Sequence, residues 1–196
     1  MEPCRLAAQN IACRRGERLL FSGLSLRLAP GQALEISGPN GTGKSSLIRI
    51  LAGLLRPFAG EVERVGRIAL VDERPALDEH QPLGKALAFW GALDGGEAPL
   101  DRLGLAHLVD VPVRYLSTGQ RKRAALARLI GQSAPVWLLD EPLNGLDRDA
   151  VPLVESIVAE HCEAGGIALV ASHQPFTVPG MTALHLPDYA DKEAGA

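Results

Sequence analysis

The sequence predicts an α/β fold in which a parallel sheet carries a phosphate-binding loop. Residues 38–45 match the pattern G-x-x-x-x-G-K-[ST], and an apolar, strand-like run over residues 33–37 leads into them. A second apolar run begins at residue 135 and ends in two carboxylates, and a third, residues 166–172, ends beside a histidine. Because ligand-binding groups gather at the carboxyl ends of the strands in α/β sheets, these runs predict one site at that edge.

The loop at residues 38–45 has the composition of a phosphate clamp. Its glycines permit backbone conformations closed to other residues and bring amide groups close to an anion. The following helix adds free amides and its positive end; Lys44 would reach the β- and γ-phosphates, and the Ser45 hydroxyl would ligate Mg²⁺. The alternative is an ordinary glycine-rich turn before a helix, but the complete pattern and its flanks favour the clamp.

Composition is that of a globular protein. The 196 residues are 46% hydrophobic, which is enough for one domain with a substantial core. The formal net charge is −3, so the chain lacks the broad basic surface with which proteins neutralise nucleic-acid phosphates. We therefore expect no nucleic-acid partner.

Cysteines and apolar segments bear on the cellular setting. The three cysteines are widely spaced and form no C-x-x-C pair, so neither a disulfide framework nor a zinc site is suggested, and we expect buried thiols in a reducing compartment. The first residues lack the apolar core of a secretory signal, and no segment reaches the roughly 18 apolar residues of a membrane span. We expect any membrane-spanning part to be another chain.

The first 72 residues are expected to combine an antiparallel β layer with the phosphate-binding strand and helix. Short apolar segments alternate with turn signals over residues 4–37, which is typical of antiparallel strands that feed the loop. The helix after the loop is expected to run to about Leu55. Residues 60–66 alternate like one arm of a hairpin, and residues 67–71 have the pattern of a buried strand.

Residues 73–115 are punctuated by proline and glycine and contain one amphipathic helix, predicted over residues 83–93. We expect a small helical lobe here, while residues 1–72 and 116–196 form the core of the same single domain. The helix carries Phe89 and Trp90. Packing within the lobe explains these aromatic side chains, and contact with a partner is the alternative.

The remainder of the chain returns to regular helix and strand patterns. Residues 121–130 predict a helix with an apolar face, and the serine and glycine just before it could hold an anion; a plain capped helix is the alternative. Another helix is expected over residues 149–163. The chain after Leu186 is short and polar, so we expect it to be loosely ordered.

Three side chains at the predicted strand ends are candidates for the chemistry. Asp140 fits the Mg²⁺-binding carboxylate of a Walker B strand, and Glu141 stands where it could polarise an attacking water. His173 ends the last strong strand, where contact with a γ-phosphate is expected, and the other four histidines are interpreted as structural or solvated. Without the phosphate-binding loop, the two acids could equally cap the next helix.

Together these motifs resemble the ABC-type ATPases, and the match covers almost the whole chain. The Walker A motif at residues 38–45, a signature-like L-S-T-G-Q at residues 116–120, the Walker B strand at residues 136–141, an aspartate turn and a switch histidine follow in family order. The resemblance implies an α/β fold with a P-loop (RecA-like) ABC ATPase core, an antiparallel β layer and a small helical lobe. It also implies ATP hydrolysis with Mg²⁺ in a head-to-tail homodimer.

The resemblance implies a role for each matching residue. The ATP-binding residues would be Gly38, Pro39, Asn40, Gly41, Thr42, Gly43, Lys44, Ser45, Ser46 and Arg15. The signature residues, which meet the ATP of the opposite protomer, would be Ser117, Thr118, Gly119 and Gln120, with Asp147 at the dimer seam. The catalytic residues would be Glu141, His173 and Lys44, and the metal ligands Ser45 and Asp140.

A narrower resemblance is to the CcmA family, the ATP-binding subunits of the haem exporter complex of cytochrome c maturation. It rests on the short length and on residues 47–57, 112–120 and 172–176. It implies integral-membrane partner subunits, a peripheral position on the cytoplasmic face of the bacterial inner membrane, and hydrolysis coupled to release of a haem-loaded chaperone. Two alternatives stay open: a soluble ABC-type ATPase acting on a ribosome, DNA or other macromolecular partner, and a nucleotide-binding module that hydrolyses ATP poorly.

Two positions depart from the family pattern. Arg15 stands where an aromatic side chain usually stacks on adenine; a guanidinium also stacks on a planar base, so adenine binding is retained while base selectivity is open. Arg74 stands at the place of the Q-loop glutamine, and arginine is no Mg²⁺ ligand, which weakens the link between metal, water and membrane partner. The intact Asp140, Glu141 and His173 argue against the poorly hydrolysing module.

Overall fold

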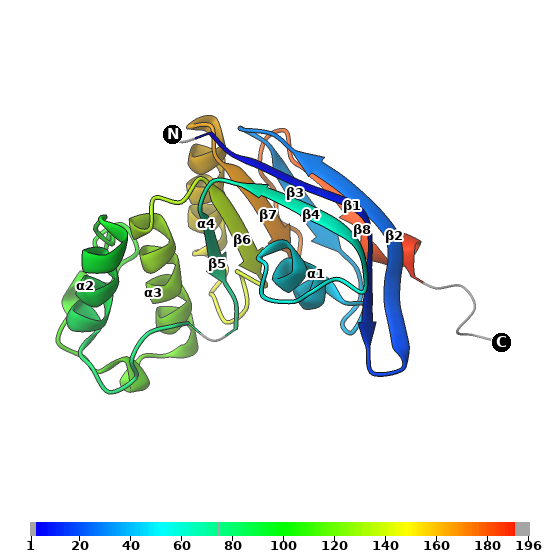
Figure 1. Ribbon diagram of the computed structural model, residues 1–196. Coiled ribbons are helices and arrows are strands. Elements are labelled where there is room, and N and C mark those ends of the chain that lie inside the picture. The colour runs from blue at the N-terminus through cyan, green and yellow to red at the C-terminus, as the bar shows by residue number, and fades with distance from the viewer. Residues whose placement is uncertain (1–2, 74, 191–196) are drawn as a thin grey trace.

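Two sheets and four helices make up the protein, which a computed structural model describes over residues 3–73 and 75–190 (Figure 1). The first sheet is antiparallel, in the order β2-β1-β4. The second has the order β5-β6-β7-β3-β8, and all its strand pairs are parallel. The strands are β1 (Arg5–Arg15), β2 (Arg18–Leu28), β3 (Ala33–Ser37), β4 (Ala59–Val65), β5 (Ile68–Val71), β6 (Val136–Asp140), β7 (Ile167–Ala171) and β8 (Thr182–His185). The α/β prediction is confirmed.

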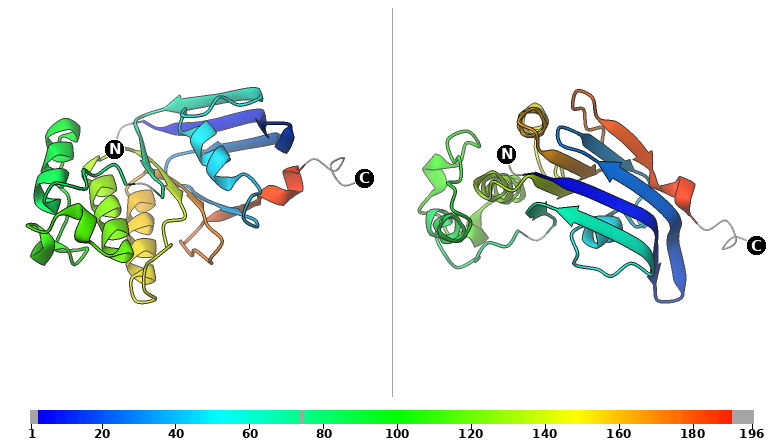
Figure 2. Two further views of the ribbon diagram at one scale, coloured as in Figure 1. Left: turned by 90° about the horizontal axis from the view of Figure 1, so that it is seen from below. Right: turned by 45° about the horizontal axis from the view of Figure 1, so that its top comes forward.

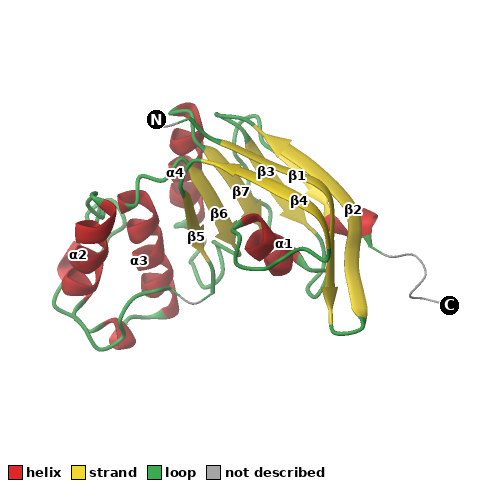
Figure 3. Cartoon of the chain, in the orientation of Figure 1, coloured by secondary structure: helices red, strands yellow, loops and turns green. Residues whose placement is uncertain are grey.

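The helices lie on both faces of the parallel sheet (Figures 2 and 3). They are α1 (Lys44–Leu51), α2 (Leu83–Asp94), α3 (Thr118–Gly131) and α4 (Val151–Glu163). Helix α1 contacts strands of both sheets and lies between them, α3 and α4 cover the other face of the parallel sheet, and α2 packs outside α3. Three short 3-10 helices, Ala106–Leu108, Val113–Tyr115 and Leu186–Tyr189, complete the fold.

Alternating side chains of the parallel strands supply two separate cores. On β6, Val136 and Leu138 join the cluster that contains α1, while Trp137 and Leu139 join the cluster of α3 and α4. All five residues of β6 and all five of β7 are buried. A strand buried on both faces needs a continuous apolar run, which explains why these strands are recognisable in the sequence.

Helix α1 is shorter than predicted, because it ends at Leu51 and not near Leu55. Gly53 adopts a left-handed conformation with φ 80°, and its amide turns back to the carbonyl of Ile50 at 3.1 Å. The guanidinium of Arg64 on β4 donates to the carbonyls of Ile50 at 2.5 Å and Leu51 at 2.7 Å. Glycine and arginine together therefore close the helix one turn early.

The prediction for residues 60–66 was right about a strand and wrong about a local hairpin. Strand β4 pairs antiparallel with β1, with Ala8 opposite Val62, although the two strands are far apart in sequence. At Gly66 (φ 90°) the chain leaves this sheet, and β5 becomes an edge strand of the parallel one. Alternation along a strand indicates which face is buried, but it does not identify the partner strand.

The chain near its C-terminal end is more ordered than predicted. Strand β8 pairs with β3, Leu186 is buried, and residues Leu186–Tyr189 form a 3-10 helix. The last six residues lie outside the described part of the chain. The three cysteines are buried and unpaired, as expected. Within residues 3–73 and 75–190, no helix combines the length and apolarity needed to span a membrane.

Candidate functional site

The predicted strand ends meet at one edge of the parallel sheet. Ala171 at the end of β7 pairs with Asp140 of β6 on one side and with Ile36 of β3 on the other. The loop that starts at Gly38 therefore lies beside the two acids and beside His173. The sheet brings together groups from three distant parts of the sequence.

The glycine-rich loop has the backbone shape that its sequence predicts. Gly41 and Gly43 have φ angles of 82° and 107°, which side chains rarely allow. A Cβ atom on Gly43 would lie 3.3 Å from atoms of Leu20 and Phe21, so β2 packs directly against the loop. The Lys44 ammonium curls over the loop and donates to the carbonyl of Gly38 at 2.7 Å. The loop thus ends at the N-terminus of α1, whose first-turn amides have no partner within the helix.

Asp140 and Ser45 form the pair expected to hold a metal ion. Asp140 is 2% exposed, and its carboxylate accepts a hydrogen bond from the Ser45 hydroxyl. Burial raises the pKa of Asp140 above its ordinary value, and the Ser45 hydrogen bond opposes that rise. Its other oxygen, Oδ1, finds no hydrogen-bond donor among the described residues. A buried carboxylate oxygen without a donor, beside a hydroxyl, fits Mg²⁺, which takes oxygen ligands.

The chain supplies only part of a metal coordination shell. In the part of the chain that the structure describes, no three His, Cys, Asp or Glu side chains gather in a group able to hold a metal. This agrees with the usual Mg²⁺ arrangement at phosphates, where one or two protein oxygens share the ion with the phosphates and with water.

Glu141 connects the loop with the switch histidine. One carboxylate oxygen lies 2.7 Å from Nδ1 of His173 and accepts from the His173 amide at 3.3 Å. The other lies 3.7 Å from the Lys44 ammonium. Glu141 is 8% exposed, while the His173 side chain is 42% exposed. The three residues predicted to be catalytic therefore touch one another in a line.

The Glu141 backbone is strained. Its φ angle is 49°, a left-handed value that is uncommon outside glycine, asparagine and aspartate. The Glu141 amide donates to the carbonyl of Ala171 at 2.8 Å, and this bond ties the turn to β7. The strain directs the carboxylate away from the strand axis toward Lys44 and His173.

The signature-like residues begin α3 and lie apart from the loop of the same chain. The Ser117 hydroxyl accepts from the Gln120 amide and the Gln120 side chain accepts from the Ser117 amide, which is a complete capping box. In Figures 1 and 2, α3 and α1 are separated by β5 and β6. The structure therefore does not join this motif to the Lys44–Glu141–His173 group within one chain.

The aspartate turn touches the signature instead. A Cβ atom on Gly145 would lie 2.6 Å from Cγ2 of Thr118, and one on Gly119 would lie 2.8 Å from the Gly145 carbonyl. Asp147 accepts from the Ala150 amide at 2.9 Å, so it caps the following turn. Sequence reasoning missed this contact, and its signal was the glycine within residues 144–147.

The two departures from the family pattern have different outcomes. Arg15 is exposed and lies opposite Arg18 at the tip of the β1–β2 hairpin. Arg74 lies outside the described residues.

Sequence reasoning also missed Lys122 on α3. It is 8% exposed and lies in a stripe with the buried Leu126 and Leu129. The i, i+4, i+7 spacing of these three residues was the available signal that the lysine faces inward.

Comparison with known proteins agrees with this geometry. Residues 21–144 match the family model described as ABC transporter. The chain is similar to the "Cytochrome c biogenesis ATP-binding export protein CcmA" of Novosphingobium aromaticivorans, with 56% identity over 96% of this chain and 99% of that protein. The protein of the same name from Zymomonas mobilis is 49% identical, over 94% of this chain and 86% of that protein.

A solved structure supports the fold. The ATP-binding subunit of an ABC transporter aligns with a TM-score of 0.80 over 92% of this chain and 86% of that chain, at 20% identity.

Proposed function

Since the chain belongs to the ABC transporter family of ATP-binding proteins, we propose that it powers a cytochrome c biogenesis export complex by binding and hydrolysing ATP. The observation that carries this proposal is the buried carboxylate of Glu141, held between Lys44 and His173 at the end of β6. That arrangement suits hydrolysis, because one carboxylate faces both a phosphate-binding cation and a polar imidazole.

The residues divide the work as follows. Amides at the start of α1 and the Lys44 ammonium bind the phosphates, and Ser45 with Asp140 would hold Mg²⁺. The metal supplies charge neutralisation at the β- and γ-phosphates. Glu141 orients a water molecule for attack on the γ-phosphorus and accepts its proton, and His173 contacts the γ-phosphate. Arg15 stacks on the adenine in place of an aromatic ring.

A second protomer completes the site. Ser117, Thr118, Gly119 and Gln120 lie apart from the loop of their own chain, so we propose that they bind the γ-phosphate of ATP held by a second copy. Asp147 would lie at the seam of this head-to-tail homodimer.

The relatives named as export proteins suggest the output of the cycle. We propose that the chain docks on integral-membrane subunits at the cytoplasmic face of the inner membrane, that residues 73–115 act as a small helical lobe, and that hydrolysis releases a haem-loaded chaperone. Ribosome action, the alternative left open by the sequence, has no observation in its favour.

Two variants test the hydrolytic assignment. Glu141→Gln keeps the shape of the side chain and removes its basicity, so ATP should still bind while turnover falls at least about a hundredfold. Lys44→Ala should weaken ATP binding itself, since it removes the cation of the loop. Equilibrium binding and phosphate release from the purified chain, alone and co-expressed with the membrane subunits, measure both effects. Near-normal turnover of Glu141→Gln would refute the role of Glu141, and unchanged affinity of Lys44→Ala would refute the phosphate clamp.

A further inference from the structure

Lys122 is a buried cation that the proposed mechanism does not use. It lies in the second turn of α3 and is 8% exposed. Burial lowers the pKa of its ammonium, while the carboxylates of Asp140 and Asp72, in that order, oppose the change. Residues 3–73 and 75–190 offer its Nζ atom no hydrogen bond and no ion pair within 4 Å. A buried charge without a direct partner is costly, so its position calls for an explanation.

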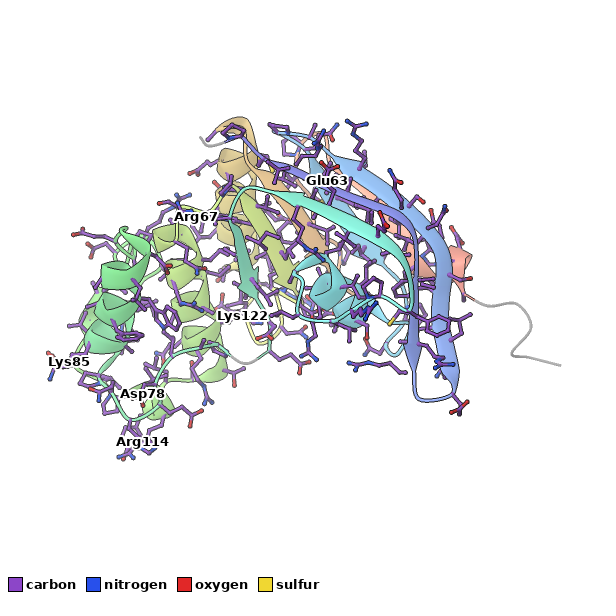
Figure 4. All side chains as sticks on the ribbon, viewed as in Figure 1. Glu63, Arg67, Asp78, Lys85, Arg114 and Lys122 are labelled. Carbon is purple, nitrogen blue, oxygen red and sulfur yellow. The ribbon has the colours of Figure 1, made fainter. Side chains whose placement is uncertain are left out.

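The environment of Lys122 is the acidic edge of the parallel sheet. Val71 of β5 pairs with Leu139 of β6, so the residues that follow, Asp72 and Asp140, leave the two strands side by side. Two adjacent carboxylates repel each other. Figure 4 shows Lys122 at the lower ends of β5 and β6, where α3 faces them.

A pocket of about 470 Å³ lies next to these groups, and Lys122, Asp72, Glu73 and Thr118 are among its lining residues. The lysine thus reaches from the signature helix to the edge that carries the hydrolytic residues. Cations on the opposite side belong to α1: Arg49 acts on Asp140, and Lys44 lies near Glu141. Lys122 is the cation that approaches this edge from α3.

Packing alone does not account for the lysine. Its helical stripe continues with Leu126 and Leu129, so an apolar side chain would fit the pattern without desolvating a charge. A cation near the beginning of a helix also opposes the positive end of the helix dipole. Both costs fall on a residue directed at Asp72 and Asp140.

We propose that Lys122 is a positioning residue of the hydrolytic site: its buried ammonium offsets the repulsion between Asp72 and Asp140 and keeps the Asp140 carboxylate directed at Ser45 and at the metal. The inference rests on the proposed function, because it assigns Asp140 to metal binding. It also links α3, which begins with the signature residues, to the metal ligand of the same chain.

The test compares Lys122→Met with Lys122→Arg and with the double variant Asp72→Asn/Lys122→Met. Lys85→Met is the matched control, since Lys85 is an exposed lysine on α2. The affinity of the full-length chain for trinitrophenyl-ATP is measured with Mg²⁺ and with EDTA, alongside the kcat for ATP hydrolysis. Methionine preserves the length and packing of the side chain and removes only its charge.

We expect Lys122→Met to keep its affinity for the metal-free nucleotide within about twofold, because the loop binds the phosphates. The gain in affinity that Mg²⁺ provides should fall at least about fivefold, and kcat at least about tenfold. Lys122→Arg restores the cation, and the double variant removes one of the repelling charges, so both should recover to within about threefold of the wild type. Lys85→Met should match the wild type.

Several results would overturn the inference. An unchanged Mg²⁺-dependent gain in Lys122→Met would do so, and so would equal losses of affinity with and without the metal. If Lys122→Met does not fold, the arginine and double variants decide, since a folded but unrecovered pair contradicts the electrostatic role. A wild-type chain that binds nucleotide without any metal dependence would overturn the proposed function, and this inference with it.

Discussion

The Arg64 side chain should contribute measurably to the stability of the phosphate-binding helix. Its guanidinium donates to two carbonyls at the end of α1, at 2.5 and 2.7 Å, where the helix leaves its last acceptors unpaired. Hydrogen bonds from a charged donor contribute about 1.5 kcal/mol or more each when buried; because Arg64 is exposed, we take about 1 kcal/mol each. Arg64→Met should therefore lower the free energy of unfolding by about 2 kcal/mol.

Urea unfolding followed by circular dichroism measures this change. For a chain of this size, about 2 kcal/mol corresponds to a fall in Tm of about 4–8 °C, with an unchanged m-value. Arg64→Lys keeps the charge but loses the two-pronged donor, so it should lose about half as much. Arg27→Met, an exposed arginine on β2, is the control for removing a surface cation. A loss below about 0.5 kcal/mol, or one equal to that of Arg27→Met, would refute the capping role.

Two further predictions concern stability in acid and the contact between the aspartate turn and the signature. Burial lowers the pKa of His161 from 6.5 to about 4, so the unfolded chain binds a proton more readily than the folded one; stability should be full above pH 6.5 and fall by up to about 3 kcal/mol as the pH drops toward 4. His161→Phe, which keeps a ring stacked on Trp137, should flatten that slope in urea unfolding at several pH values, and an unaltered slope would contradict the assignment. Gly145→Ala places a Cβ atom 2.6 Å from Thr118, and should lower ATP turnover at least about tenfold without weakening nucleotide binding. Gly180→Ala has the same positive φ strain but open space around it, so equal losses in both variants would remove the contact as the cause.

Much of the fold could be predicted because the essential strands are buried on both faces. The run from Val136 to Leu139 is continuous and apolar, so its strand and its terminal carboxylates are legible from the sequence. Strand β8 was missed for the opposite reason, since three of its four residues are exposed and only Leu184 is buried. The partner of β4 was missed because pairing with β1 depends on contacts between distant segments.

The site was predictable in its members and less so in its geometry. Lys44, Glu141 and His173 were named from motifs, but the line of contacts among them depends on the left-handed turn at Glu141, which no local pattern announces. Lys122 escaped notice because charged residues are usually exposed, and its burial follows only from the packing of α3. Sequence patterns thus specify chemistry more readily than they specify the cost at which it is held.

The backbone turn at Glu141 places turnover and thermostability in opposition at a single residue. A left-handed φ of 49° costs a glutamate about 1 kcal/mol, and glycine or asparagine would adopt it with less strain. Selection for heat resistance alone would therefore favour replacing the one side chain that faces both Lys44 and His173. Engineering of this fold for durability should exempt position 141, because a more robust variant found there would be an inert one.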